Sequence, residues 1–497
     1  MYGRLLALTA IIAAISLAAV AEESQLPVPA APVILYTDLV AGPIKGGEND
    51  LGAYVAVFGR HFGNVADQAH VYFGSREAAA YRYFGPSKGL PEVQQITVQP
   101  GAVGAGSLPI SVVVNGVVSN VNHPFLVNPG NVLFVDNVDG SDLRGRANRL
   151  DRPWRHLQAG DRGGALGAAG PGDVIVLRGK SPWSDIGFDN RWARFWDETG
   201  TAPTGKAGTG YITIEAYPGE DVYYLAPRKT HGGIHGASAA RAGMAGLYVV
   251  VAGLRIESVA SSSSDGAPLN LQSSADEWRV VNNDLSWPNA ATDSKAGGIA
   301  GNCNHCKLLG NKIHDIGGGT ENHGIYLDGS EFGTVSAVVA YNWIVRTHGG
   351  NGIQSYNAHV GGHTEPNIGL NLHGNRIEDG TRYGINLADG TRSAIVFDNT
   401  VIDTDYAGIR LNLDDPALDV DIHNNTISNV CRRQTPVSGA IINTATATSG
   451  SVVIRENTIT KGPQSTCSHG YVNDSEDKAL SFQDNHWQGF DVPLAGG

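Results

Sequence analysis

The C-terminal half of the chain repeats one short pattern of apolar and polar positions. A Gly-Ile step followed by alternating side chains occurs at Gly298-Ile299, Gly324-Ile325, Gly352-Ile353, Gly384-Ile385 and Gly408-Ile409. A second mark, Asn-x-apolar, accompanies it at Asn283, Asn311, Asn342, Asn375, Asn399, Asn425, Asn457 and Asn485. Consecutive Asn positions are separated by 24 residues (Asn375 to Asn399) up to 33 residues (Asn342 to Asn375). A fixed pattern at variable spacing is typical of a solenoid whose coils carry loops of different length.

Each coil is predicted to contain β-strands rather than helices. The runs 335–341 (VSAVVAY), 393–397 (SAIVF) and 418–422 (LDVDI) are short, largely alternating and rich in β-branched residues. Gly, Asn and Asp turns separate them, so the pattern predicts a parallel β-helix. The recurring Asn is interpreted as a turn residue whose side-chain amide bonds the backbone of the turn and stacks on the Asn one coil above, and it is not counted as chemistry.

Residues 33–128 form a separate block with a different pattern. Alternating runs end in Asn115-Gly116, which is a strong hairpin signal, so the block predicts a small immunoglobulin-like sandwich. The segments 56–63 (AVFGRHFG), 71–74 (VYFG), 110–120 and 125–127 resemble the IPT/TIG family of immunoglobulin-like domains. The resemblance implies a spacer or a module that contacts carbohydrate or protein, and it implies no catalytic residues.

Residues 131–490 are expected to form the second domain. The segments 134–142 (FVDNVDGSD), 152–158 (RPWRHLQ), 170–177 (GPGDVIVL) and 212–220 (ITIEAYPGE) resemble the first coils of right-handed parallel β-helix proteins of the pectin-lyase-like superfamily. The resemblance implies an all-β fold: a sandwich followed by a right-handed parallel β-helix. It does not imply one activity, because the superfamily includes lyases, hydrolases, epimerases and non-catalytic adhesins.

Composition and the N-terminus indicate the compartment. The chain has 497 residues, of which 65 are Gly and only 17% are charged, as suits a turn-rich β protein. Arg4, the apolar run 5–20 and the Ala19-Val20-Ala21 site predict a signal peptide over residues 1–21, so the mature protein is expected to be secreted or periplasmic. No later apolar run is long enough to span a bilayer. The formal net charge of −13 argues against nucleic acid or an anionic membrane as a partner, and a monomer is expected.

The four Cys residues and several acidic residues are candidates for disulfides or for metal ligands. In an exported protein the four Cys are expected to form disulfides, with Cys431 and Cys467 the most natural pair. Cys303 and Cys306, with His305 between them, leave free thiols or a metal open, although no fourth ligand is nearby. The acid pairs Asp414-Asp415 and Asp419 with Asp421 leave Ca²⁺ open but lack the spacing of a known loop, so no cofactor is expected.

The coil alignment also predicts a surface for a ligand. Side chains alternate across a strand, so the residue after each Gly-Ile step faces outward. The first predicted outward column is Ala300, Tyr326, Gln354, Asn386 and Arg410, and the second is Asp328, Tyr356, Ala388 and Asn412. The residues expected to rim these columns are Lys295, Glu321, His323, His348, Asn351, Arg382 and Tyr383. A polar floor of several strands suits a polymer.

The chemistry expected of this surface is polysaccharide cleavage. β-Elimination from a uronic-acid polymer needs a group that neutralises the carboxylate, a base and an acid. Candidate catalytic residues are His323 and Tyr326 as base and acid, Lys295 as a rival base, and Arg382 as a neutralising group. Candidate substrate-binding residues are Asp328, His348, Asn351, Gln354, Tyr356, Tyr383 and Arg410.

The sequence leaves two other functions open, and it allows two interpretations of one aromatic insertion. Hydrolysis would use Asp328 with Glu331, Glu321 or Glu365. A glycan-binding or adhesin-type solenoid would need no catalytic group. The aromatic insertion from Trp183 to Trp196 is interpreted either as a cap over the first coils or as a wall that stacks on sugar rings.

Overall fold

The computed structural model describes fourteen stretches of the chain. They are residues 30–195, 204–227, 232–236, 247–259, 266–272, 275–290, 296–328, 333–357, 366–412, 417–433, 438–444, 449–473, 480–490 and 494–495. Several residues named above lie outside them: the signal peptide, Lys295, Glu331, Glu365, Trp196, Asp414 and Asp415.

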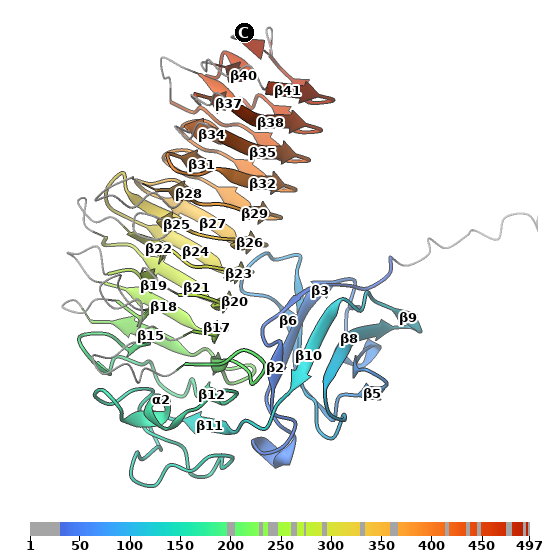
Figure 1. The fold of residues 1–497 in the computed structure, drawn as a ribbon, viewed down its shortest axis with the longest axis vertical. Coiled ribbons are helices and arrows are strands. Elements are labelled where there is room, and N and C mark those ends of the chain that lie inside the picture. Colours follow the sequence, from blue (N-terminus) through green and yellow to red (C-terminus); the bar gives the residue numbers. More distant parts are fainter. Residues whose placement is uncertain are drawn as a thin grey trace, which may run out of the picture.

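Two small sheets pack face to face at the N-terminal end as a β-sandwich (Figure 1). The first sheet has the order β1 (Val33–Thr37), β3 (Val55–Arg60), β7 (Gln94–Gln99) and β6 (Ala80–Pro86). The second has the order β2 (Ala41–Gly42), β10 (His123–Val127), β8 (Ser107–Val114), β4 (Ala69–Phe73) and β5 (Arg76–Glu77), with β9 (Val117–Val118) paired to β8. Two 3-10 turns join these strands, η1 (Glu48–Asp50) and η2 (Ala66–Gln68). Phe73 and Phe125 meet edge to face in the core, with 5.3 Å between ring centroids.

The rest of the described chain is a solenoid of three parallel sheets (Figure 1). The twelve-stranded sheet contains β11 (Val132–Val135), β12 (Val174–Leu177), β14 (Ile212–Ala216), β17 (Val249–Ala252), β20 (Arg279–Val281), β23 (Lys307–Leu309), β26 (Val338–Ala340), β29 (Leu370–His373), β32 (Ser393–Phe397), β35 (Ala417–His423), β38 (Ser449–Arg455) and β41 (Leu480–Gln483). The eleven-stranded sheet contains β13 (Ala193–Arg194), β16 (Ile234–His235), β19 (Leu269–Gln272), β22 (Ala296–Gly301), β25 (Asn322–Asp328), β28 (Ile353–Tyr356), β31 (Ile385–Ala388), β34 (Ile409–Asn412), β37 (Gly439–Asn443), β40 (His469–Asn473) and β43 (Leu494–Ala495). The ten-stranded sheet contains β15 (Tyr223–Ala226), β18 (Arg255–Ser258), β21 (Asp284–Trp287), β24 (Lys312–Ile316), β27 (Trp343–Thr347), β30 (Arg376–Glu378), β33 (Thr400–Ile402), β36 (Thr426–Ser428), β39 (Thr458–Thr460) and β42 (His486–Gln488). One short helix, α2 (Gly164–Ala168), precedes β12. The all-β prediction is therefore confirmed.

The Asn residues that mark each coil form one continuous ladder inside the solenoid. Asn342 is fully buried, and its side-chain amide nitrogen donates to Oδ1 of Asn375 and to the carbonyl of Leu308. Its own Oδ1 accepts bonds from the main-chain and side-chain nitrogens of Asn311. The same pattern links each neighbouring pair from Asn283 to Asn485. The ladder is structural, as the sequence predicted, because its donors and acceptors are used between coils.

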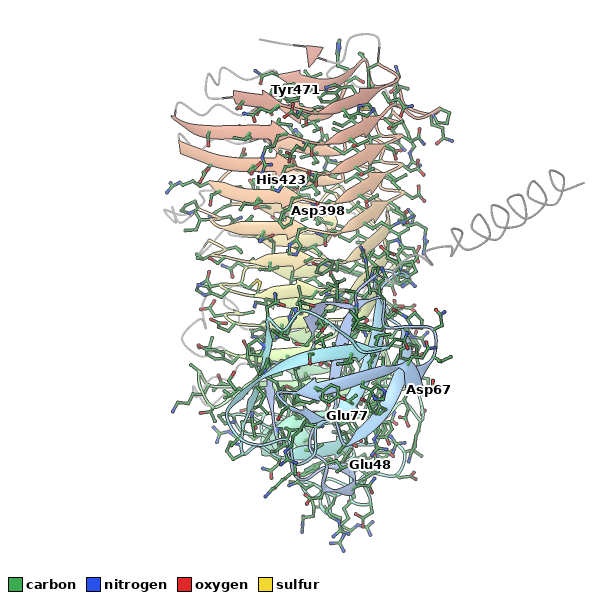
Figure 2. All side chains as sticks on the ribbon, turned by 90° about the vertical axis from the view of Figure 1, so that its right-hand side faces the viewer. Glu48, Asp67, Glu77, Asp398, His423 and Tyr471 are labelled. Carbon is green, nitrogen blue, oxygen red and sulfur yellow. A yellow bond between two sulfur atoms is a disulfide. The ribbon has the colours of Figure 1, made fainter. Side chains whose placement is uncertain are left out.

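The sandwich packs against the outer face of the twelve-stranded sheet (Figure 1). Alternation sends Val251 and Val280 into the solenoid core, so their neighbours face outward and meet the sandwich. The apolar residues of this interface are Val250, Ala252, Val281, Leu309 and Ala340 from the solenoid, with Tyr36, Ala56, Phe58, Leu90 and Val93 from the sandwich. Figure 2 shows this side, where Asp398 and His423 lie on coils that rise beyond the sandwich.

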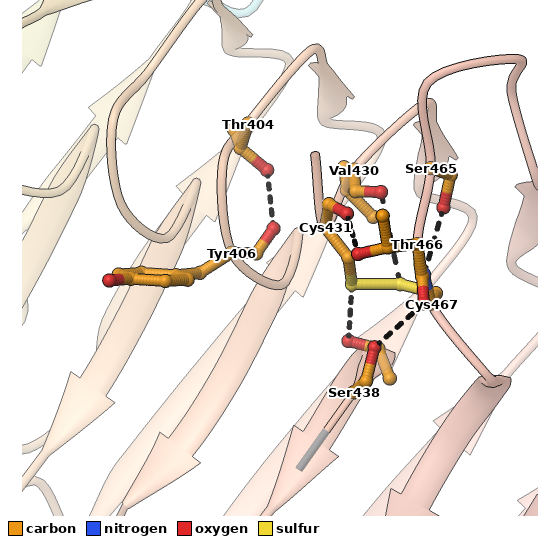
Figure 3. Close-up of a disulfide and its surroundings, with 9 residues drawn as sticks. Thr404, Tyr406, Val430, Cys431, Ser438, Ser465, Thr466 and Cys467 are labelled. Atoms are coloured by element: carbon orange, nitrogen blue, oxygen red, sulfur yellow. Dashed lines mark hydrogen bonds between the residues drawn. A yellow bond between two sulfur atoms is a disulfide. The ribbon is translucent and has the colours of Figure 1, made fainter. Parts of the chain in front are cut away.

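Two disulfides and an aromatic insertion complete the described solenoid. Cys303 bonds Cys306, and Cys431 bonds Cys467, which joins neighbouring coils as predicted (Figure 3). The rings of Trp183, Trp192 and Phe195 are fully buried in the solenoid core, so they do not form a wall that stacks on sugar rings. The segment is also not only a cap over the first coils, because β13 within it pairs with β16 as a strand of the solenoid. No helix among the described residues is long and apolar enough to cross a membrane.

Candidate functional site

The predicted outward column exists in the eleven-stranded sheet. Strand pairing places Ala300 beside Tyr326, Tyr326 beside Gln354, Gln354 beside Asn386, and Asn386 beside Arg410. The same register runs back through earlier coils to Asn270, His235 and Arg194. Eight aligned positions at about 4.8 Å per strand span roughly 34 Å. The column is thus longer than the sequence predicted. Beyond Arg410 the register continues through the apolar residues Ile442 and Val472, so the polar positions run from Arg194 to Arg410 with an interruption at Ala300.

The three early members of the column were missed by the sequence reasoning. Arg194 and His235 lie on strands of two residues each. Arg194 lacks the Gly-Ile step, whereas Gly233-Ile234 directly precedes His235 and was a readable signal. Asn270 had a readable signal, because Leu269-Asn270-Leu271 alternates as the later rungs do. Arg194 is not free for a ligand, since its side chain pairs with Asp161 and Asp189.

The middle of the column is enclosed rather than open. Tyr326 is 8% exposed, Gln354 6% and Asn386 5%. The amides bond one another: the side-chain nitrogens of Asn351 and Asn386 both donate to Oε1 of Gln354. Within the described residues, the buried Oδ1 of Asn386 has no hydrogen-bond partner. A buried acceptor without a donor is costly, so this oxygen is suited to a hydroxyl group from a ligand or to a water.

His323 lies beside the column as a neutral imidazole. Its Nδ1 accepts the main-chain N–H of Asn351 at 2.9 Å, so the ring proton is on Nε2. Burial, with a smaller contribution from the positive charge of Arg382, lowers the pKa of His323 to about 3. The ring contacts that of Tyr326, with 4.9 Å between centroids. This geometry makes His323 a donor through Nε2.

Tyr326 is held in its protonated form. Burial raises the pKa of its phenol far above the usual range, and the carboxylates of Asp328 and Glu321 add to the shift. These two acids therefore stand close enough to Tyr326 to act on its charge. At neutral pH Tyr326 keeps its proton and is able to donate it or share it in a hydrogen bond.

Two arginines and an aromatic ring form the charged end of the site. The guanidinium carbon of Arg410 lies 5.1 Å from the ring centroid of Tyr383, and that of Arg382 lies 6.0 Å away. Arg382 also donates to the carbonyl of Thr320 at 3.0 Å. The main-chain N–H of Tyr383 donates to Oδ1 of Asn351 at 3.1 Å, which joins this group to the amide network. Arg410 is partly exposed and donates to Oδ1 of Asn412 at 2.8 Å.

The remaining predicted residues are distributed around this group. Asp328 and Tyr356 pair in the second column and are partly exposed. His348 is exposed and lies apart from the column, with Nε2 3.9 Å from Oδ1 of Asp315. Lys295 lies outside the described residues. The site thus brings together His323, Tyr326, Asn351, Gln354, Arg382, Tyr383 and Arg410.

The described residues offer no group for a metal ion. No cluster of three or more His, Cys, Asp or Glu in these stretches has the geometry to hold one. Asp421 pairs instead with Arg455 at 2.9 Å.

Comparison with known proteins supports the fold of the solenoid. The family model described as "Right handed beta helix region" matches residues 299–486, which is less than half of the chain. No curated protein matched the chain.

Several solved structures are also similar to this chain, at low sequence identity. The chain is similar to the A-module of the mannuronan C-5 epimerase AlgE4 of Azotobacter vinelandii, at 14% identity and a TM-score of 0.36, covering 66% of this chain and 90% of that one. It is similar to the catalytic unit of a GH87 α-1,3-glucanase of Streptomyces thermodiastaticus, at 12% identity and a TM-score of 0.35, covering 88% and 87%. It is also similar to the surface protein and adhesin PfbA of Streptococcus pneumoniae, at 9% identity and a TM-score of 0.30, covering 66% and 92%. At these values the similarities assign no residue a role.

Proposed function

We propose that the chain is an exported carbohydrate-active protein that binds an acidic polysaccharide along the eleven-stranded sheet and cleaves it by β-elimination. The observation that carries this proposal is the register column Tyr326, Gln354, Asn386 and Arg410, with the guanidinium groups of Arg410 and Arg382 beside one aromatic ring. A repeated polar column matches a repeated ligand, and two guanidinium groups at its end suit carboxylates.

Each residue of the site has a separate role in the proposed elimination. Arg410 and Arg382 bind and neutralise the uronate carboxylate, which makes the proton on the adjacent carbon more acidic. Tyr326 keeps its proton at neutral pH and supplies it to the leaving oxygen. The Nε2–H of His323 donates a hydrogen bond beside it.

The base for the α-proton is Lys295 in this proposal. His323 was the other candidate, but its Nδ1 already accepts a main-chain N–H and its lowered pKa makes it a weak base. Lys295 directly precedes β22, whose Ala300 pairs with Tyr326. Replacing His323 is therefore expected to disturb the position of Asn351 rather than remove the base.

Two observations favour alternative functions. Asp328 and Glu321 both act on Tyr326, and two carboxylates beside one site suit hydrolysis. The enclosed, mutually bonded amides of Asn351, Gln354 and Asn386 suit a rigid binding surface without turnover. Both alternatives predict that the same column contacts glycan.

A screen of acidic and neutral polysaccharides separates these functions. Elimination produces an unsaturated sugar that absorbs in the ultraviolet, whereas hydrolysis produces reducing ends without that absorbance. Binding without either product supports the non-catalytic function. The absence of both binding and product with every polymer tested would contradict the whole proposal.

Removal of the Tyr326 hydroxyl group tests its assigned role as the general acid. Tyr326→Phe removes only the hydroxyl and is expected to lower turnover by about 100-fold, which is within the range for losing a general acid. Tyr81→Phe, on the sandwich, is the matched control and should leave turnover unchanged. Full activity in Tyr326→Phe would remove this residue from the mechanism.

Secretion and the identity of the sandwich belong to the same proposal. The sandwich strands of residues 33–127 support an IPT/TIG-like module that holds or extends the solenoid. The N-terminal sequence of protein recovered outside the cell tests the cleavage after Ala21, and an intact Met1 would contradict it.

A further inference from the structure

A cavity of about 230 Å³ lies between the sandwich and the solenoid, and none of its lining residues belongs to the column described above. Residues from both parts line it: Asp38, Tyr54, Phe58 and Tyr83 from the sandwich, and Glu215 and Asn282 from the solenoid. By the same measure a single water needs only about 10–15 Å³, so the cavity has room for a small organic molecule.

Two carboxyl groups from different parts of the molecule face this cavity. Glu215 is on β14, where Ile212 and Ile214 point into the solenoid core and alternation sends Glu215 outward. Asp38 directly follows β1 of the sandwich. Glu215 is 3% exposed and Asp38 6%. Burial, and for Glu215 also the nearby Asp38, raises the pKa of both groups.

The two carboxyl groups differ in their hydrogen-bond partners, and the main chain of Tyr54 bonds Glu215. Oδ1 of Asp38 accepts the main-chain N–H groups of Leu39 and Ala56, at 2.6 and 2.8 Å. Among the described residues, the buried Oε1 of Glu215 has no hydrogen-bond partner. The nearby guanidinium of Arg279 is committed elsewhere, because it donates to the main-chain carbonyls of Asp38 and Thr37 at 3.0 and 2.5 Å.

The missing partner is therefore a positive charge. Buried carboxylates in proteins are normally paired, and an unpaired one loses its ionised form. Arg279 supplies one charge for two acids, so one carboxyl keeps a proton unless another cation enters. A ligand cation would replace that proton and bond the free Oε1 of Glu215.

The lining favours an organic cation over a metal ion. Two carboxylates are too few, and the described residues contain no group of three or more His, Cys, Asp or Glu that could hold a metal. The rings of Tyr54, Phe58 and Tyr83 supply apolar and π surface, which attracts ammonium groups and their carbon chains. The cavity is also far larger than a bare ion requires.

We propose that this cavity is a binding site for a small primary ammonium ligand, with Glu215 as its principal contact and Asp38 as the second carboxylate. This inference goes beyond the function proposed for the column and does not depend on it. The ligand would bridge the two parts of the molecule, so its binding should tighten the contact between sandwich and solenoid.

Other charged groups around the cavity set its pH response. They are Arg279 on β20, Lys88 after β6, and Glu220 and Asp221 at the rim, with Glu48 bonded to the hydroxyls of Tyr54 and Tyr217. Glu220 is paired with Arg178, and Lys88 lies 3.9 Å from Asp221. The carboxyl group that keeps a proton thus remains the group from which a bound cation would displace that proton, and binding should strengthen as pH rises.

Calorimetry and thermal shift with the whole protein test the proposal. The probes are ethanolamine as the primary ammonium, choline as a quaternary one, ethylene glycol as a neutral analogue, and CaCl₂. Ethanolamine is expected to bind saturably, raise the unfolding temperature and release a proton, which appears as a heat that depends on the ionisation enthalpy of the buffer. Choline should bind more weakly, because its quaternary ammonium group has no N–H to donate to Glu215.

Glu215→Gln is the decisive variant, since it keeps the shape and removes the charge. It is expected to weaken ethanolamine binding at least tenfold, while Glu92→Gln, an exposed acid on the sandwich, should change nothing. If Glu215→Gln fails to fold, Asp38→Asn with the same readouts takes its place. Equal binding in the variant, preference for ethylene glycol or Ca²⁺, or no saturable ethanolamine binding by the native protein would each overturn the proposal.

Discussion

Two outer faces of the same solenoid are used in opposite ways. The twelve-stranded sheet presents Val250, Val281 and Leu309 outward, and the sandwich covers this part of the sheet. The eleven-stranded sheet presents amides and guanidinium groups, such as Gln354 and Arg410, at equivalent outward positions. Both faces follow the same strand alternation, so the difference lies only in the side chains at alternate positions.

The comparison teaches which side chains attract a domain and which suit a ligand. Apolar outward residues gain about 25 cal/mol for each Å² removed from water, and a second domain is the natural way to remove it. Polar outward residues gain little from a fixed cover, because their hydrogen bonds with water must be replaced one by one. Most polar groups of the column form hydrogen bonds with one another. Oδ1 of Asn386 and the guanidinium groups of Arg382 and Arg410 remain for a ligand.

The strongest way to break the comparison is to make the covered face polar. Val281→Asp places a carboxylate in a fully buried apolar contact and is expected to cost about 3 kcal/mol or more of unfolding free energy. Urea unfolding measures the loss, and X-ray scattering in solution shows whether the sandwich has separated. Val118→Asp, at a valine that is 55% exposed, is the control and should cost less than about 0.5 kcal/mol. Similar small effects in both variants would mean that the covered face does not hold the sandwich.

The polar face should respond to acid through His323. Its folded-state pKa of about 3 lies below the ordinary value of 6.5, so the folded state binds fewer protons between these values. Its contribution to stability is complete above pH 6.5 and is lost as pH falls toward 3, with a slope of up to about 1.4 kcal/mol per pH unit. Urea unfolding between these limits should show a steeper slope in the native protein than in His323→Gln. Exposed His305→Gln should retain the native slope, and an unchanged slope in His323→Gln would refute the assignment.

Ligand binding should depend on the arginine at the end of the column. Arg410→Gln removes the charge from a partly exposed side chain and is expected to weaken binding of an acidic polysaccharide by about tenfold, equivalent to about 1.4 kcal/mol. Its unfolding free energy should change by less than about 0.5 kcal/mol. Arg76→Gln, exposed on the sandwich, is the matched control for affinity. A large loss of stability without a loss of affinity would mean that Arg410 serves packing only.

The smallest expected effect concerns the coupling between Arg382 and His323. The positive charge of Arg382 helps to lower the pKa of His323, so Arg382→Gln should raise that pKa by a fraction of a unit while burial keeps it low. Nitrogen NMR of labelled histidine follows the titration directly. Arg76→Gln, exposed on the sandwich, serves for comparison, and a fall in the His323 pKa would show that the two groups are not coupled in this way.

The sequence alone determined the local and repeating features of this protein. The Asn-x-apolar spacing predicted the ladder, and the Gly-Ile step predicted the register from Ala300 to Arg410 without error. The comparable positions of Cys431 and Cys467 predicted their disulfide. These features were readable because strand alternation and coil spacing are properties of short stretches, and neighbouring coils repeat them.

Only the tertiary structure decided which surfaces are covered and which groups are charged. The docking of Tyr36 and Phe58 on Val281, the burial of Gln354 and the neutral state of His323 each depend on segments far apart in the chain. The register through Arg194 also escaped the sequence, since its two-residue strand carries no repeat signal. Burial, pairing and pKa are set by long-range packing, and no periodic pattern in a single sequence encodes them.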